Sequence, residues 1–176
     1  MTGSRRGRTG GVPLLGAVLG ILALVAVPTS AQADCNDPAG PGVEWRRCYF
    51  DSRDLSKVDL TGAMLHDATF QRADLREADL SKARATRTKF MSADLRGAKL
   101  DGTELREADF TRADLTGASL READLMRTRF FGARLRDADF TGARMRGTDF
   151  LNADLSGAIW IDGQRRCAEG SIGQCH

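Results

Sequence analysis

Cysteine, aspartate and arginine are the residues of this chain whose number and spacing could support chemistry. The four cysteines form two pairs, one near each end of the sequence: Cys35 with Cys48, and Cys167 with Cys175. An even number of cysteines in an exported chain is typical of disulfide bonds. Sequence alone allows three connectivities, and proximity along the chain favours one bond within each pair. A metal site lacks ligands, because no CxxC occurs and His66 and His176 are the two histidines.

Aspartate recurs at intervals of twenty residues and could in principle form a stack that binds cations. The stack consists of Asp54, Asp74, Asp94, Asp114 and Asp154. Arg76, Arg96 and Arg136 each stand two residues after a position of this series, namely 74, 94 and 134. Carboxylates on an exposed face pair readily with neighbouring arginines. We therefore interpret the stack as part of the sequence pattern and predict no bound metal.

Arginine is enriched in a second set of positions related by intervals of twenty residues, which we call the arginine column. This column could attract anions. Its members are Arg84, Arg87, Arg106, Arg127, Arg144 and Arg146. The same column contains Asp67, Glu104, Glu107 and Asp124. An anion-binding patch should contain fewer interleaved acids, so we expect a solvated face of mixed charge.

Apolar residues at outward positions mark one candidate contact spot, formed by Met91, Phe131 and Leu151. Phe131 and Leu151 are twenty residues apart and would be stacked neighbours, which favours a contact surface. No catalytic constellation accompanies it: His66 has no recognisable nucleophile motif nearby, and Ser, Cys and Asp occur as repeat or cap residues. We predict a protein that is not an enzyme and that has no cofactor and no small-molecule substrate.

A repeat of five residues must position all of these side chains. A large apolar residue stands at every fifth position from Phe50 to Trp160, giving 23 consecutive centres, and alanine stands two residues before most of them. Neither a helix nor a strand buries one face with this period, whereas a solenoid of stacked units does. Ala85 is small where the pattern requires a large side chain. If nothing refills the volume, Ala85→Leu should stabilise the fold.

A second period of twenty residues lies within the first. Six of the eight phenylalanines follow it, at Phe50, Phe70, Phe90, Phe110, Phe130 and Phe150. The next column, from Leu55 to Leu155, is leucine throughout. Twenty residues are four pentapeptides. We therefore expect a four-sided coil with a ladder of stacked phenylalanine rings along one side.

The repeat resembles the A(D/N)Lxx pattern of the pentapeptide repeat family, as in Ala73-Asp74-Leu75-Arg76-Glu77. The resemblance covers roughly residues 48–160 and implies an all-β fold, a right-handed quadrilateral β-helix of about six coils. Some cytoplasmic members of that family protect DNA gyrase by imitating the shape and negative charge of duplex DNA. Mimicry of DNA would need an acidic rod, which the composition of this chain does not provide.

The N-terminal residues 1–33 have the pattern of a secretory signal peptide. Arg5, Arg6 and Arg8 precede an apolar run of 16 residues, Val12 to Val27, and a small-x-small site ends at Ala33. The run is shorter than the roughly 20 residues of a comfortable membrane span, although an uncleaved anchor is the alternative. Arg5-Arg6 leaves both the Sec and the twin-arginine routes open. Cleavage after Ala33 would leave 143 residues with 23 basic and 24 acidic side chains, a net charge of −1.

The predicted organisation is thus a signal peptide (1–33), an N-terminal cap loop (34–47), the repeat helix (48–160) and a C-terminal cap loop (161–176). Solenoid ends are unpaired strand edges and need caps. We expect Cys48 to hold the front loop and Trp160 to close the apolar shaft at the rear.

The sequence favours an exported, periplasmic or secreted scaffold, monomeric or weakly dimeric, that meets a protein or surface partner. Two alternatives remain: a DNA-mimicking gyrase inhibitor or protector, and a peripheral binder of anionic surfaces that uses the arginine column. Nucleic acid is not an expected partner, because the mature chain is close to neutral.

Overall fold

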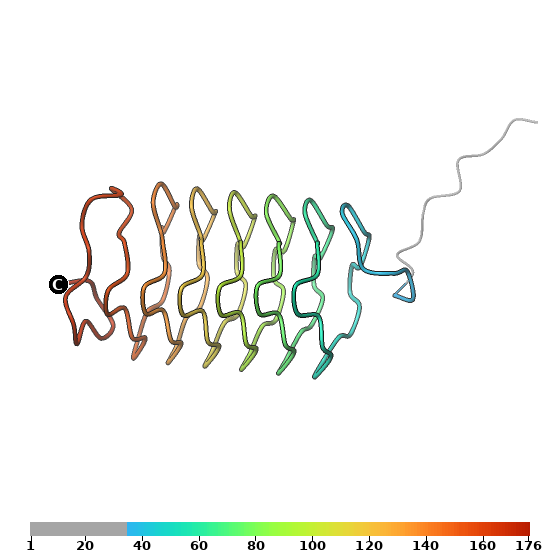
Figure 1. Cartoon of the computed structure of the whole chain (residues 1–176), viewed down its shortest axis with the longest axis horizontal. Coiled ribbons are helices and arrows are strands. Elements are labelled where there is room, and N and C mark those ends of the chain that lie inside the picture. Colours follow the sequence, from blue (N-terminus) through green and yellow to red (C-terminus); the bar gives the residue numbers. More distant parts are fainter. Residues whose placement is uncertain (1–34) are drawn as a thin grey trace, which may run out of the picture. The chain divides into compact units, whose positions relative to one another are not determined.

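A computed structural model describes residues 35–176, in which the backbone winds into stacked coils (Figure 1). The expected signal peptide, residues 1–33, lies outside the described residues. Within residues 35–176 no helix is long and apolar enough to cross a membrane.

Each coil contains twenty residues and has four sides of five residues. Parallel bridges join every side to the same side one coil later, for example Thr69 to Lys89, Asp74 to Asp94 and Asp79 to Lys99. The described residues contain neither helices nor longer strands, because each side contributes one bridged residue before the chain turns. Bridges with this offset run from Glu44 to Ile159. The predicted right-handed quadrilateral β-helix is therefore confirmed.

Six full coils extend from Val43 to Asp162, and we number their sides in chain order from the first coil. The centres of side one are Trp45, Leu65, Ala85, Leu105, Leu125 and Met145. Side two has the six phenylalanines from Phe50 to Phe150, and side three has the leucines from Leu55 to Leu155. Side four has Leu60, Leu80, Leu100, Leu120, Phe140 and Trp160.

A turn at every corner makes this winding possible. The amide of Ala63 donates to the carbonyl of Leu60 at 3.0 Å, and the amide of Ala98 donates to that of Leu95 at 3.0 Å. The third residue of each turn has positive φ, as in a type II turn, and glycine is suited to it. Fifteen of these residues are not glycine, among them Arg112 with φ of 58°.

The core is a narrow shaft filled by the centres and by the small residues two positions before them. Almost all of these side chains are fully buried. The phenylalanines of side two stack with centroid separations from 4.7 Å (Phe90 to Phe110) to 5.3 Å, and with interplanar angles of 16° or less. The expected aromatic ladder is thus present. Where threonine replaces alanine, its buried hydroxyl donates to a backbone carbonyl, as Thr128 does to Leu105 at 2.7 Å.

The regular coil begins at Val43, five residues before the start predicted from the sequence. The segment 43–47 lacks alanine and leucine, so the repeat pattern does not reveal it. Trp45 nevertheless occupies a centre position, is 2% exposed and packs 4.1 Å from the Phe50 ring. Its indole NH donates to the carbonyl of Asp37 at 3.2 Å, which attaches the front loop to the shaft.

The C-terminal segment, residues 163–176, folds back over the last coil (Figure 1). Antiparallel bridges join Ile159 to Arg166 and Asp154 to Ile172, so this cap covers sides three and four. Trp160, half-buried, lies 6.0 Å from the Phe140 ring and 5.8 Å from the Phe150 ring, measured between centroids. It closes the rear of the shaft.

Both ends carry a disulfide bond. Cys35 is bonded to Cys48 and Cys167 to Cys175, the two pairs that proximity in sequence favoured. Cys48 is fully buried at a small position of the shaft, and Cys167 is 2% exposed. The first bond therefore connects the front loop to the core, and the second closes a loop within the C-terminal cap, whose Cys167 packs in the core.

Reduction of these disulfides should destabilise the rod. Loops of this length are expected to contribute about 2–4 kcal/mol each, chiefly by restricting the unfolded chain. Thermal unfolding of the oxidised and the reduced protein, followed by circular dichroism, measures the effect. Equal melting temperatures in the two states would contradict a capping role.

Filling the small centre position on side one should stabilise the shaft. Ala85 is fully buried between coils whose corresponding residues are Leu65 and Leu105. We expect Ala85→Leu to increase the free energy of unfolding by up to about 2–4 kcal/mol, as measured by urea denaturation. Ala83→Leu is the matched control: Ala83 is equally buried but occupies a small position, so overpacking should destabilise the fold. A lower stability for Ala85→Leu would mean that the space is already filled.

Candidate interaction surfaces

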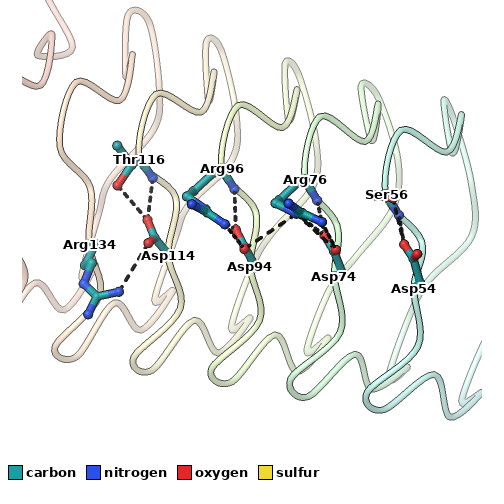
Figure 2. A network of polar contacts seen from close by, with 9 residues as sticks. All are labelled: Asp54, Ser56, Asp74, Arg76, Asp94, Arg96, Asp114, Thr116 and Arg134. Carbon is teal, nitrogen blue, oxygen red and sulfur yellow. Dashed lines mark hydrogen bonds and ion pairs between the residues drawn. The ribbon is translucent and has the colours of Figure 1, made fainter.

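The aspartates that precede a centre support the corners of the coil. In all eleven, Oδ1 accepts the backbone amide of the residue two positions later. Figure 2 shows this contact along side three, from Asp54 to Ser56 at 3.0 Å and from Asp114 to Thr116 at 3.0 Å. A short acceptor side chain that satisfies a nearby amide favours a turn. These aspartates thus have a structural role at each corner.

Arginines pair with the same carboxylates (Figure 2). Arg96 donates to both oxygens of Asp94, at 2.8 and 2.6 Å, and Arg76 contacts Asp74 at 2.5 Å. Arg136 pairs with Asp154 at 3.2 Å, as the sequence predicted. Sequence reasoning missed that Asp114 is paired with Arg134, which lies one coil later, at 3.3 Å. The stack is therefore largely neutralised by its neighbours.

These pairs stabilise the charged form of the carboxylates. The Arg96 guanidinium holds the pKa of the Asp94 carboxyl below its ordinary value, and Arg76 does the same to the pKa of Asp74. Among residues 35–176 no arginine forms an ion pair with Asp54; hydrogen bonds from the amide and the hydroxyl of Ser56 lower the pKa of its carboxyl. Within the described part of the chain, no group of three or more His, Cys, Asp or Glu side chains could hold a metal ion.

The arginine column of side one also consists mainly of ion pairs. Five of its six members contact a carboxylate on the same side, at distances between 2.6 and 3.8 Å: Arg84 with Glu104, Arg87 with Asp67, Arg106 and Arg144 with Asp124, and Arg127 with Glu107. Arg146 makes no ion pair within residues 35–176. Most of the pairs join neighbouring coils, so positive and negative charges alternate along the rod. The column is therefore a face of mixed charge.

A shallow hollow of about 390 Å³ lies at the corner between sides one and two. Its lining residues are Arg87, Lys89, Glu107, Ala108, Asp109, Arg127 and Arg129. Arg129 binds Asp109 at 2.8 Å, and the nearby Arg127 and Glu107 also pair. The hollow can attract charged groups, but its own carboxylates already have partners.

His66 lies in a second hollow, of about 300 Å³, with Arg46, Arg47 and Asp67. Partial burial lowers the pKa of His66, so the ring is neutral near pH 7. No serine, threonine or cysteine side chain among residues 35–176 donates a hydrogen bond to a histidine ring. The hollow therefore offers charged side chains as contacts.

The predicted apolar spot on side two is narrower than its sequence implies. Met91 and Phe131 are half-buried, so Leu151, with 59% of its surface exposed, is the one member of the predicted spot that is well exposed. Three exposed apolar residues were not predicted: Tyr49 (78%), Ile161 (43%) and Ile172 (52%). Tyr49 and Ile161 stand at outward positions of the repeat, a signal that was present in the sequence. Ile172 depends on how the cap folds back, which no repeat pattern specifies.

Comparison with known proteins identifies the repeat. A family model described as pentapeptide repeats matches the chain in 8 copies, at residues 46–81, 54–90, 88–127 and 123–159. A search of curated proteins returned no match.

Three solved structures illustrate the similarity. Full-length QnrB1, a plasmid-mediated fluoroquinolone resistance protein, is 23% identical over 68% of this chain and 74% of its own, with a TM-score of 0.43. Rfr23, a pentapeptide repeat protein from the cyanobacterium Cyanothece 51142, is 26% identical over 66% and 90%, with a TM-score of 0.40. A pentapeptide repeat protein from the Arabidopsis thaliana thylakoid lumen is 22% identical over 70% and 81%, with a TM-score of 0.32.

Low pH should destabilise the fold, because it protonates the aspartates that pair with arginines at the corners. Because the folded pKa of Asp94 is below its unfolded value, the folded state binds fewer protons, and stability falls as the pH drops below about 4. We expect Asp94→Asn to keep the acceptor for the Arg96 amide and to cost less than about 1 kcal/mol at about pH 7. It should also reduce the loss of stability between about pH 7 and about pH 3, as measured by urea unfolding.

Asp94→Ala is the matched control, because it removes both the ion pair and the acceptor of the Arg96 amide. Losing the corner hydrogen bond should make Asp94→Ala less stable than Asp94→Asn by about 1 kcal/mol at about pH 7. Equal stability of the two variants would show that the amide contact contributes nothing.

Proposed function

The chain belongs to the pentapeptide repeat family, and on that premise we propose that it is an exported, non-enzymatic scaffold whose sides bind a protein or another surface. The observation that carries this proposal is that the apolar side chains point inward and are occupied in packing the shaft. They fill the shaft along all six coils, and backbone hydrogen bonds join each coil to the next. Such a rod is stiff, and the outward positions are left for contacts.

The two disulfides support a non-reducing compartment, since cytosolic thiols are kept reduced. The basic and apolar pattern of residues 1–33 supports export across a membrane. Together they favour a periplasmic or secreted protein.

The distribution of charge supports a partner with both acidic and basic groups. Between Glu44 and Asp162, the outward positions of sides three and four carry 13 acidic and 8 basic residues. Those of sides one and two carry 8 acidic and 12 basic residues. A partner with two patches of opposite sign would complement the rod, and complementarity of this kind orients a complex more than it strengthens it.

The same distribution argues against mimicry of DNA. A duplex presents a dense, uniform negative charge. Here the carboxylates of side three alternate with arginines that neutralise them, and sides one and two have a basic excess. Peripheral binding to an anionic surface is also disfavoured, because most of the arginine column is already paired.

The decisive experiment is the intact mass of the non-reduced protein, recovered from separated cytoplasmic and exported fractions of its host. We expect an exported species with the mass of residues 34–176 less four hydrogens. This mass corresponds to cleavage after Ala33 and two disulfides. A full-length, reduced species confined to the cytoplasm would contradict export.

A supercoiling assay with DNA gyrase distinguishes the proposed scaffold function from mimicry of DNA. We expect no change in gyrase activity when the oxidised protein is added, because the rod lacks a sustained negative face. Inhibition or protection of gyrase would favour the mimic and would count against the proposed scaffold.

A further inference from the structure

The N-terminal end of the shaft is covered on only part of its circumference. The front loop, residues 35–42, lies at this end of the rod (Figure 1). Its attachments to the first coil all lie on side one or at a corner beside it: the disulfide of Cys35 with Cys48, the Gly42 amide on the carbonyl of Thr61 at 2.8 Å, and the Trp45 indole on the carbonyl of Asp37 at 3.2 Å. Among the described residues, the front of side three has no such attachment.

A hollow of about 270 Å³ lies between the front loop and the first coil. Its floor is apolar and consists of Trp45, Phe50 and Leu55, and Pro38 and Ala39 of the loop also line it. Leu55 is partly exposed, whereas the other five leucines of side three are fully buried. Pockets for drug-sized ligands typically have volumes of about 300–1,000 Å³. This hollow is slightly smaller, so it suits a small ligand with an apolar group that covers Leu55.

Arg53 supplies a positive charge at the rim of the hollow. It stands at an inward position of side three where the five later coils have alanine, and it fits there because no coil lies in front of it. Its guanidinium carbon lies 5.8 Å from the centroid of the Phe50 ring. Among residues 35–176 Arg53 forms no ion pair. An unpaired guanidinium above an apolar floor suits a carboxylate, which can accept two of its N–H groups.

The backbone beside Arg53 offers a second donor. In later coils the amide that precedes the side-three centre donates to the previous coil, as Asp74 does to the carbonyl of Arg53 at 2.9 Å. The equivalent amide of Asp54 has no hydrogen-bond partner among residues 35–176. It points toward the front of the rod, and both of its neighbours, Arg53 and Leu55, line the hollow. The Asp54 carboxylate is occupied by the amide and the hydroxyl of Ser56, so the free amide remains available to an acceptor.

Asp37 supplies the opposite charge. Asp37 and Arg53 are the two charged residues that line the hollow. Within the described part of the chain, Asp37 pairs neither with Arg53 nor with any other cation. A simple anion in the hollow would be attracted by Arg53 and repelled by Asp37, whereas a ligand that carries both a carboxylate and an ammonium group complements both charges.

We propose that this hollow is a binding site for a free amino acid with an apolar side chain, such as leucine or phenylalanine. The carboxylate of the ligand accepts hydrogen bonds from the Arg53 guanidinium and the Asp54 amide, and its ammonium group lies beside the Asp37 carboxylate. The apolar side chain covers Leu55, in the place that the preceding centre takes in later coils. The ligand is bound and not transformed, and the site is separate from the scaffold contacts on the outward sides.

The test is a titration of the disulfide-bonded protein with leucine or phenylalanine, followed by NMR of the tryptophan indole N–H groups. Trp45 lines the hollow, and Trp160 lies at the opposite end of the rod. We expect the Trp45 signal to shift and saturate while the Trp160 signal stays in place. Serine has the same charged groups without an apolar side chain, and it should bind at least about tenfold more weakly than leucine.

Two analogues of leucine test the charged contacts one at a time. Leucinamide lacks the carboxylate, and N-acetyl-leucine lacks the ammonium group. Each should bind at least about tenfold more weakly than leucine, because it leaves Arg53 or Asp37 without its partner. Binding of N-acetyl-leucine as tight as that of leucine would assign the hollow to the C-terminal residue of a peptide and would overturn the proposal of a free amino acid.

Arg53→Gln should weaken the binding of leucine at least about tenfold. Arg72→Gln is the matched control, because Arg72 is also exposed and also forms no ion pair among residues 35–176, but it does not line the hollow. It should leave the affinity unchanged, and neither variant should lower the melting temperature. A Trp45 signal that leucine does not shift, leucinamide that binds as tightly as leucine, or unchanged affinity in Arg53→Gln would each overturn the proposal. The outward sides are not involved, so each of these results would leave the proposed scaffold function standing.

Discussion

The structure depends on a corner that the chain must turn every five residues. Each corner places a residue at positive φ and leaves the amide of the preceding residue to be satisfied. The aspartate before the centre accepts that amide, and the alanine after the turn donates back to the carbonyl of the centre. The small residue, the acid and the large residue of the repeat are thus consequences of one local geometry.

The corner also decides where the other interactions can form. Because every coil turns at the same places, like residues lie above one another at inter-strand spacing. On the inside this gives the phenylalanine ladder, and on the outside it brings charges of neighbouring coils together, as in Arg87 with Asp67. The outer surface therefore becomes a set of columns, and a column whose charges alternate neutralises itself. This explains why 13 of the 19 arginines among residues 35–176 form ion pairs.

Sequence reasoning predicted the interior well and the exterior less well. The period of five, the four sides and the aromatic ladder follow from which residues are apolar. The conformation of Arg112 does not, because an arginine by itself disfavours positive φ and adopts it here under the hydrogen bonding of neighbouring coils. The pair of Asp114 with Arg134, and that of Arg136 with Glu169 at 2.9 Å, depend on rotamers and on the fold of the cap. The start of the coil at Val43 was missed because Trp45 occupies the centre position where leucine is usual.

The register of twenty residues restricts how such a rod can change its length in evolution. The rings of Phe90 and Phe110 stack because equal numbers of residues separate them around the shaft. An insertion or deletion of twenty residues preserves every column and only lengthens or shortens the rod. A change of five residues would rotate all later coils by one side, so that phenylalanines would stack on leucines and paired charges would face new neighbours. Duplication of whole coils is the route that keeps the core and the surface intact together.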